Sequence, residues 1–471
     1  MMNSHDMKHT LFAQDALLPS GWANNVLLQW NRQGQITAVQ ANSALPPGVP
    51  QAPGPLLPGM PNLHSHAFQR AFAGLTEHRV DTNDNFWSWR TLMYRFALAL
   101  TPDQLEAIAT WLYIEMLEAG YTQVCEFHYL HHESNGQPYA DDATLAHCLL
   151  RAAQNTGIAL TLLPVLYQSS GFGGTPPTDG QRRFIRSTDN MLNLLAKLKP
   201  LCEAQGARLG LAPHSLRAVP PVGLREAIAG LDAMDKTAPI HIHIAEQTAE
   251  VDACVAWSGQ RPVEWLLNHA DVNPRWCLVH ATHMSEQEYQ RAASSGAVAG
   301  LCPSTEANLG DGIFDVPRWL SHGGAFGVGS DSHVTVNAAE ELMLLEYGQR
   351  LVRRERNVLA HAQHHQTATA MTLAAVAGGV QAAGRMTPGL STGLATGQPA
   401  DMVALDARHH TMAGLSAPDM LAAHVFASNR TTALHSVWVG GQARVSAGRH
   451  ALRESAAQAF VGARSELISG T

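Results

Sequence analysis

The chain has 471 residues, of which 45% are hydrophobic and 15% charged, and its formal net charge is -8. This composition is typical of a globular protein with a substantial core, and it provides no general attraction to nucleic acid or to an anionic membrane. No run of about 18 apolar residues and no basic segment leading into an apolar one stand out, so neither a transmembrane helix nor a secretory signal is expected.

Short strands are expected at the start of the chain, where residues 25–30 and 35–39 flank a turn as in a hairpin. After a Pro/Gly-rich linker, apolar runs alternate with helical segments. The candidate strands are residues 57–66, 123–129, 159–166, 208–216, 239–244, 276–282, 297–302 and 324–329. Eight strand–helix units predict an α/β fold, a (β/α)8 TIM-like barrel.

Two further helices are expected over residues 338–353 and 367–384, and the tail returns to short strands at 401–406 and 435–445. Because this tail mirrors the N-terminal hairpin, both chain ends are predicted to form one small β-sandwich beside the barrel. The predicted domains are therefore residues 1–56 and 391–471 for the sandwich and 57–390 for the barrel.

The opening strand of the predicted barrel ends in His64-Ser-His66. In an extended strand, side chains spaced i, i+2 point to the same face, so the two imidazoles form half of a zinc or iron site. Alone the pair is weak evidence, because the chain contains 25 histidines.

Further polar residues follow the other predicted strands, where a barrel of this kind collects its catalytic groups. They are Glu126, His128, Tyr129, His214, Arg217, His241, His243, Glu246, His280, His283, Asp331 and His333. This clustering indicates one functional site at the carboxyl ends of the strands.

The arrangement resembles the amidohydrolase superfamily, in its His64-x-His66, His243-x-x-Glu246, His280 and Gly-Ser-Asp331 units and its tail from Gly397 to Val403. The runs 60–70, 86–94 and 302–311 are similar to the formimidoylglutamate deiminase family within it. The resemblance extends from about residue 10 to about residue 450. It implies zinc-dependent hydrolysis of N-formimidoyl-L-glutamate to N-formyl-L-glutamate and ammonia, a step of histidine degradation.

The same resemblance implies that one zinc ion is held by His64, His66, His243 and Asp331. Three imidazoles and a carboxylate suit zinc with room for a water molecule, although the ligand types alone leave Fe2+ or Mn2+ open. Asp331 would also accept a proton from the attacking water. His280 would stabilise that water or the intermediate, and Glu246 would pass a proton to the leaving nitrogen.

A substrate with two carboxylates needs fixed cations, and arginine binds a carboxylate through two parallel hydrogen bonds. The resemblance assigns this role to Arg90 and Arg217, with Gln69, Tyr129 and His214 beside them. In a plainer interpretation, Arg90 pairs with an acid on its own helix.

Other histidines have alternative interpretations. His241 shares a face with His243 and could replace it as a ligand, but the Glu246 spacing favours His243 and places His241 in the barrel wall. The group His128, His131 and His132 could form a second metal site, with a solvated loop as the favoured interpretation. His283 and His333 are expected to support the ligands or to be exposed.

The aromatic run Phe86, Trp87, Trp89 and Tyr94 is expected to pack a helix over the mouth of the barrel, with a lid as the sharper hypothesis. The loop near residues 170–180 is expected to be mobile. Cys302 and the other five scattered cysteines are expected to be free thiols, which favours a cytoplasmic protein.

Two other functions compete with the deiminase. A deaminase of a purine or related heterocycle would need aromatic stacking and amide groups in its pocket, and a non-catalytic barrel would bind a metal without turnover. The expected partner is a small dicarboxylate substrate, without nucleic acid or membrane, and the resemblance implies a homodimer.

Overall fold

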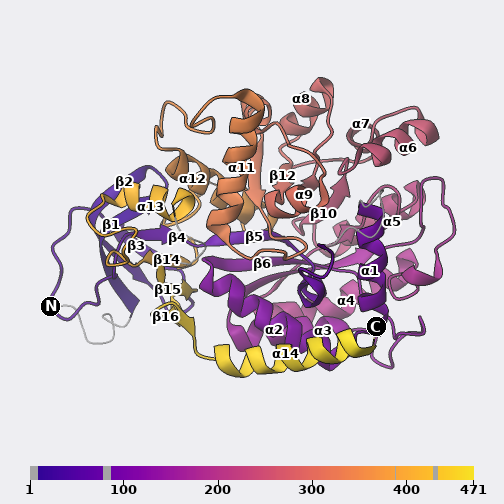
Figure 1. Cartoon of the computed structure of the whole chain (residues 1–471), viewed down its shortest axis with the longest axis horizontal. Coiled ribbons are helices and arrows are strands. Elements are labelled where there is room, and N and C mark those ends of the chain that lie inside the picture. The colour runs from indigo at the N-terminus through magenta and orange to yellow at the C-terminus, as the bar shows by residue number, and fades with distance from the viewer. Residues whose placement is uncertain (1–8, 78–85, 388, 428–432, 471) are drawn as a thin grey trace.

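Two sheets of parallel strands carry the polar residues singled out above, and a third sheet lies at one end of the molecule (Figure 1). The computed structural model describes residues 9–77, 86–387, 389–427 and 433–470. No helix in these ranges is long and apolar enough to cross a membrane.

Among the described residues, the end sheet has eight strands, which come from both ends of the chain. Its order is β17 (Arg449–His450), β16 (Gln442–Ser446), β15 (Leu434–Val439), β14 (Met402–Leu405), β4 (Leu56–Pro58), β1 (Thr10–Leu18), β2 (Gly21–Trp30) and β3 (Ile36–Gln40). The antiparallel pairing of β2 with β3 confirms the predicted hairpin. Residues such as Leu28, Leu56 and Met402 form a core separate from the main one. The second layer of a sandwich and the domain bounds stay predictions.

The first parallel sheet contains β5 (Met60–Ser65), β6 (Tyr121–His128), β7 (Ala159–Leu166), β8 (Arg208–Leu209) and β9 (Ala212–Pro213). The second contains β10 (Ile240–Ile244), β11 (Trp276–His280), β12 (Val298–Leu301) and β13 (Ala325–Val328). Most of these strands are buried along their whole length, which explains their apolar sequences. The predicted strands lie at these positions, with two exceptions. The one at 57–66 is divided between β4 of the end sheet and β5, and the one at 208–216 is two short strands.

Isolated bridges connect the edges of the two parallel sheets. Ser65 pairs with Asp331 beyond β13, and Leu211 pairs with Ile240 of β10. The backbone N–H of Asp331 donates to His64 O at 3.0 Å, so the ends of β5 and β13 are held together. Continuous strand pairing stops at both junctions, and the closed eight-stranded barrel stays a prediction.

Helices alternate with the parallel strands, as the sequence predicts. They are α1 (Phe86–Ala99), α2 (Pro102–Glu118), α3 (Thr144–Thr156), α4 (Thr188–Ala204), α5 (Pro221–Met234), α6 (Thr248–Ser258), α7 (Pro262–His269), α8 (Glu286–Ser294), α9 (Pro303–Leu309), α10 (Val316–Ser321), α11 (Ala338–Arg353) and α12 (Thr367–Ala382), with the short 3-10 helices η2 (Ala67–Phe72) and η3 (Asp179–Gln181). α12 packs so closely on β13 that a β-carbon at Gly378 would lie 2.0 Å from Phe326 O. Glycine at this position therefore allows the close approach.

Two C-terminal helices were not anticipated from the sequence, α13 (Ala417–Phe426) and α14 (Arg453–Gly470). α14 runs along α2 rather than along the end sheet (Figure 1). The ring of Phe460 stacks on Trp111 at 6.0 Å, and Arg453 forms an ion pair with Glu118. The chain therefore ends against a helix of the strand–helix region.

Candidate active site

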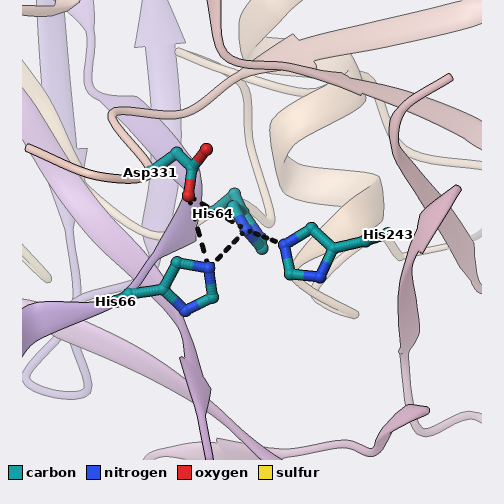
Figure 2. A group of neighbouring side chains, drawn as sticks. All are labelled: His64, His66, His243 and Asp331. Atoms are coloured by element: carbon teal, nitrogen blue, oxygen red, sulfur yellow. Dashed lines mark hydrogen bonds and ion pairs between the residues drawn. The ribbon is translucent and has the colours of Figure 1, made fainter. Parts of the chain in front are cut away.

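Four side chains from three strand ends converge on one point (Figure 2). His64 Nε2 lies 3.1 Å from His66 Nε2 and 2.9 Å from His243 Nε2. Asp331 Oδ1 lies 3.3 Å from His66 Nε2 and 3.5 Å from His64 Nε2. Ligands at zinc-bonding distance on the corners of a tetrahedron would be about 3.3 Å apart, so the donor atoms are spaced as the edges of such a site require.

Backbone carbonyls orient two of these imidazoles. His66 Nδ1 lies 2.9 Å from Phe127 O, and His243 Nδ1 lies 3.2 Å from His214 O. A carbonyl can only accept, so each Nδ1 carries the proton and each Nε2 lone pair faces the common point. Burial lowers the pKa of His64 to about 3 and lowers the pKa of His66 and His243 as well. Neutral imidazoles are the form that binds a metal.

A second group of ionisable side chains adjoins the cluster around His280. Its Nε2 lies 3.7 Å from Asp331 Oδ2 and 3.8 Å from Glu246 Oε1, and its Nδ1 lies 3.2 Å from Glu306 Oε1. Burial alone would lower the pKa of His280, but the three carboxylates raise it to about 10. Burial raises the pKa of Glu246 to about 7. The arrangement can hold and transfer protons beside the cluster.

A cavity that opens to solvent adjoins both groups, and its empty space, including the open mouth, is about 590 Å³. It is lined by His66, Gln69, Trp89, Arg90, Met93, Tyr94, Tyr129, Tyr167, Phe184, His214, Arg217, His243, Glu246, His280, Thr305, Leu309 and Asp331. All five predicted substrate residues are among them. Gln69 Nε2 donates to the hydroxyl of Tyr129 at 2.9 Å, and Arg90 donates to the hydroxyls of Tyr94 and Tyr167.

Residues 56–444 match the amidohydrolase family. The chain belongs to the amidohydrolase family. It is 49% identical to the formimidoylglutamate deiminase of Pseudomonas aeruginosa, over 97% of this chain and 99% of that protein. It is 28% identical to a 5-methylthioadenosine/S-adenosylhomocysteine deaminase of Nitratidesulfovibrio vulgaris, over 78% of this chain and 72% of that protein. The crystal structure of an amidohydrolase from Brucella melitensis superposes with a TM-score of 0.92 at 47% identity, covering 98% of this chain and 100% of that one.

Backbone strain is concentrated where this amidohydrolase positions its polar groups. Asp331, His333, Ala245 and His280 all have positive φ, between 44° and 66°. Residues other than glycine adopt this conformation only when the surrounding structure requires it. Here the turns after β10, β11 and β13 bring side chains from the strand ends toward one cavity.

The histidines outside the metal cluster have structural partners. His241 is fully buried and its Nε2 lies 2.7 Å from Ala382 O, which places it in the wall as expected. His333 is also fully buried, and its Nε2 accepts from the backbone N–H of His66 at 3.2 Å. His283 is partly exposed, with its Nε2 2.8 Å from Asp311 O.

The solvated-loop interpretation of His128, His131 and His132 is wrong, because all three are buried. His131 Nε2 lies 2.9 Å from Val165 O, and His132 Nε2 lies 2.8 Å from Ile185 O. Within the described ranges they also join no carboxylate or thiolate in a group that could hold a metal. His131 and His132 therefore connect the segment after β6 to β7 and to the residues that follow η3.

Four residues beside or behind the cavity are not among the site residues that the sequence predicts. Glu306 lies in the run 302–311, which resembles the family, and Tyr94 lies in the aromatic run expected to pack over the mouth. Tyr167 and Gln181 had no local signal. Trp89 lines the cavity and its ring lies 5.9 Å from that of Phe72, while the side chains of Phe86 and Trp87 lie outside the described residues.

Proposed function

We propose that this amidohydrolase hydrolyses N-formimidoyl-L-glutamate to N-formyl-L-glutamate and ammonia. The observation that carries the proposal is that Arg90 and Arg217 line the same cavity as Asp331 and His243. Two guanidinium groups beside a metal-binding cluster suit a substrate with two carboxylates and one hydrolysable C–N bond. The extensive identity to the Pseudomonas aeruginosa deiminase supports the same assignment.

Zinc is the metal that we propose for the cluster of His64, His66, His243 and Asp331. The convergent lone pairs, the low pKa of the three buried imidazoles and the tetrahedral spacing support it, although Fe2+ or Mn2+ would accept the same ligand types. When bound, zinc activates water for attack at neutral pH.

The chain's own residues then supply positioning and proton transfer. The two carboxylate oxygens of Asp331 face different groups: Oδ1 lies at the cluster, and Oδ2 lies toward His280. This carboxylate can therefore accept a proton from the attacking water. His280, held through Nδ1 by Glu306, donates one hydrogen bond from Nε2 to the developing oxyanion. Glu246 delivers a proton to the leaving nitrogen, which departs as ammonia.

The substrate's carboxylates are assigned to the arginines, with Gln69, Tyr129 and His214 positioned at the same cavity. The two hydroxyls that accept from Arg90 orient its guanidinium. A purely apolar pocket would bind the dicarboxylate poorly, because its carboxylates would leave water without gaining charged partners.

A purine-type deaminase is the second candidate, favoured by the 28% identity to the 5-methylthioadenosine/S-adenosylhomocysteine deaminase. An ammonia-release assay with N-formimidoyl-L-glutamate, guanine and adenosine separates the two. We expect release from the first compound only. Release from guanine or adenosine alone would replace the proposal, and metal binding without any turnover would support a non-catalytic barrel. A homodimer, a cytoplasmic location and a role in histidine degradation accompany the proposal as predictions.

A further inference from the structure

We propose that Tyr94 and Tyr167 are further carboxylate-binding residues of this cavity, and that Gln181 behind them holds both as hydrogen-bond donors. The inference rests on the proposed function, because it assigns the two hydroxyls to one carboxylate of the dicarboxylate. The three residues come from distant segments: Tyr94 lies on α1, Tyr167 directly follows β7, and Gln181 lies in η3.

Gln181 has a fixed amide orientation. Its side chain is fully buried, and its Oε1 accepts the backbone N–H of Thr178 at 2.8 Å. A backbone N–H can only donate, so the NH2 group must point the other way. There Nε2 lies 2.8 Å from the oxygen of Tyr167 and 3.2 Å from that of Tyr94. Gln181 therefore donates to both hydroxyl oxygens.

Arg90 acts on the same two oxygens from the cavity side. Its Nε donates to Tyr94, and a terminal nitrogen donates to Tyr167 at 3.4 Å. Both hydroxyls are thus acceptors toward Gln181 and Arg90, and their own protons must point elsewhere. The two hydroxyls can share at most one of these protons between themselves, so at least one is left to donate to a ligand. Burial raises the pKa of Tyr167, which keeps its proton at neutral pH.

The part of the cavity around Arg90 consequently presents donors. Tyr94, Tyr167 and Arg217 all line it, and both arginines act electrostatically on Tyr167. Donor hydroxyls beside guanidinium groups match an anionic acceptor, and a carboxylate can accept from several of them at once. The neutral amide of Gln181 adds no negative charge behind this site.

Gln181 is held in place by Arg183, two positions later in the chain. Arg183 is fully buried and donates to the carbonyls of Ala97 and Leu100 at the end of α1, and to His132 O at 2.7 Å. These bonds tie η3 to the helix that carries Arg90 and Tyr94. Gln181 is therefore a positioning residue, whereas the tyrosines are proposed to touch the substrate.

The test compares Tyr94→Phe, Tyr167→Phe and Gln181→Glu with a control, Tyr347→Phe, whose ring packs on Phe426 outside the cavity. At least one of the two tyrosine variants is expected to raise KM for N-formimidoyl-L-glutamate about 10- to 100-fold, the usual effect of losing a hydrogen bond to a charged group, with little change in kcat. In Gln181→Glu a carboxylate accepts the tyrosine protons and repels the substrate, so KM is expected to rise at least as far. The control is expected to behave as the unmodified protein.

Two substrate analogues separate contact from a general structural effect. N-formimidoyl-4-aminobutyrate lacks the α-carboxylate, and N-formimidoyl-L-2-aminobutyrate lacks the γ-carboxylate. If a tyrosine contacts one carboxylate, the rise in KM caused by Tyr→Phe persists with the analogue that keeps this carboxylate. It vanishes with the analogue that lacks it. An equal effect on all three compounds, or an unchanged KM in both tyrosine variants, would overturn the inference.

Calorimetric titration with glutarate keeps this inference distinguishable from the proposed function, because glutarate binding needs no turnover. If N-formimidoyl-L-glutamate releases no ammonia, the proposed function fails on its own. Glutarate affinity about 10- to 100-fold weaker in either tyrosine variant would still support the carboxylate site. Equal glutarate affinity in both variants and the unmodified protein would refute it. Because this measurement uses only the tyrosine variants, it tests the carboxylate site even if Gln181→Glu fails to fold.

Discussion

Acidification is expected to destabilise this protein through buried histidines that lie outside the metal cluster. Burial lowers the pKa of His128 to about 3 and that of His424, on α13, to about 4. In the unfolded chain both titrate near the ordinary pKa of about 6.5, so the unfolded state binds protons that the folded state excludes. The stability is therefore fully present above pH 6.5 and is lost as the pH falls toward 4.

The loss of unfolding free energy depends on the difference between the pH of the measurement and the pKa of histidine in the unfolded chain. At pH 5 each unfolded-state histidine is about 1.5 units below its pKa, whereas the folded-state groups remain mostly neutral. At about 1.4 kcal/mol per unit, each histidine costs about 2 kcal/mol of unfolding free energy between pH 7 and pH 5. Two such groups together remove about 4 kcal/mol, a large part of the stability of an ordinary protein.

Urea unfolding followed by circular dichroism at several pH values between 7.5 and 5 measures this loss. His424→Gln should show a pH dependence smaller by about one proton, or about 2 kcal/mol over the range. His365→Gln, at an exposed position, is the matched control and should keep the dependence of the unmodified protein. The reasoning is refuted if His424→Gln and the unmodified protein lose the same free energy on acidification.

Three predictions concern the site. Asp331→Asn should lower ammonia release at least about 1000-fold while the thermal unfolding midpoint changes little, because the carboxylate is proposed to act as both ligand and base. Appreciable activity in this variant would contradict the proposed role. Arg217→Ala should raise KM for the dicarboxylate about 10- to 100-fold, whereas Arg408→Ala, at an exposed position, should not; an unchanged KM would move the carboxylate site elsewhere. Chelation should abolish activity, and zinc should restore it with about one ion per chain by metal analysis; full activity in metal-free protein would exclude a metal-dependent reaction.

The strand ends were predictable because local patterns determine where a buried strand stops. His64 and His66 share a face by the two-residue period of a strand, and the structure places their Nε2 atoms 3.1 Å apart. Their convergence with His243 and Asp331 was expected from parallel strands ending at one edge. Gln181 carried no such signal, because its partners Tyr94 and Tyr167 are 87 and 14 positions away.

The sequence by itself determined the alternation of strands and helices, the family and the residues whose chemistry suits a metal, because these depend on composition, periodicity and short motifs. Only the tertiary structure decided that Glu306 meets His280, that His128 is buried and that α14 lies along α2. Such contacts depend on how distant segments pack. A side chain's burial and charge environment are therefore set by neighbours that its own stretch of sequence does not contain.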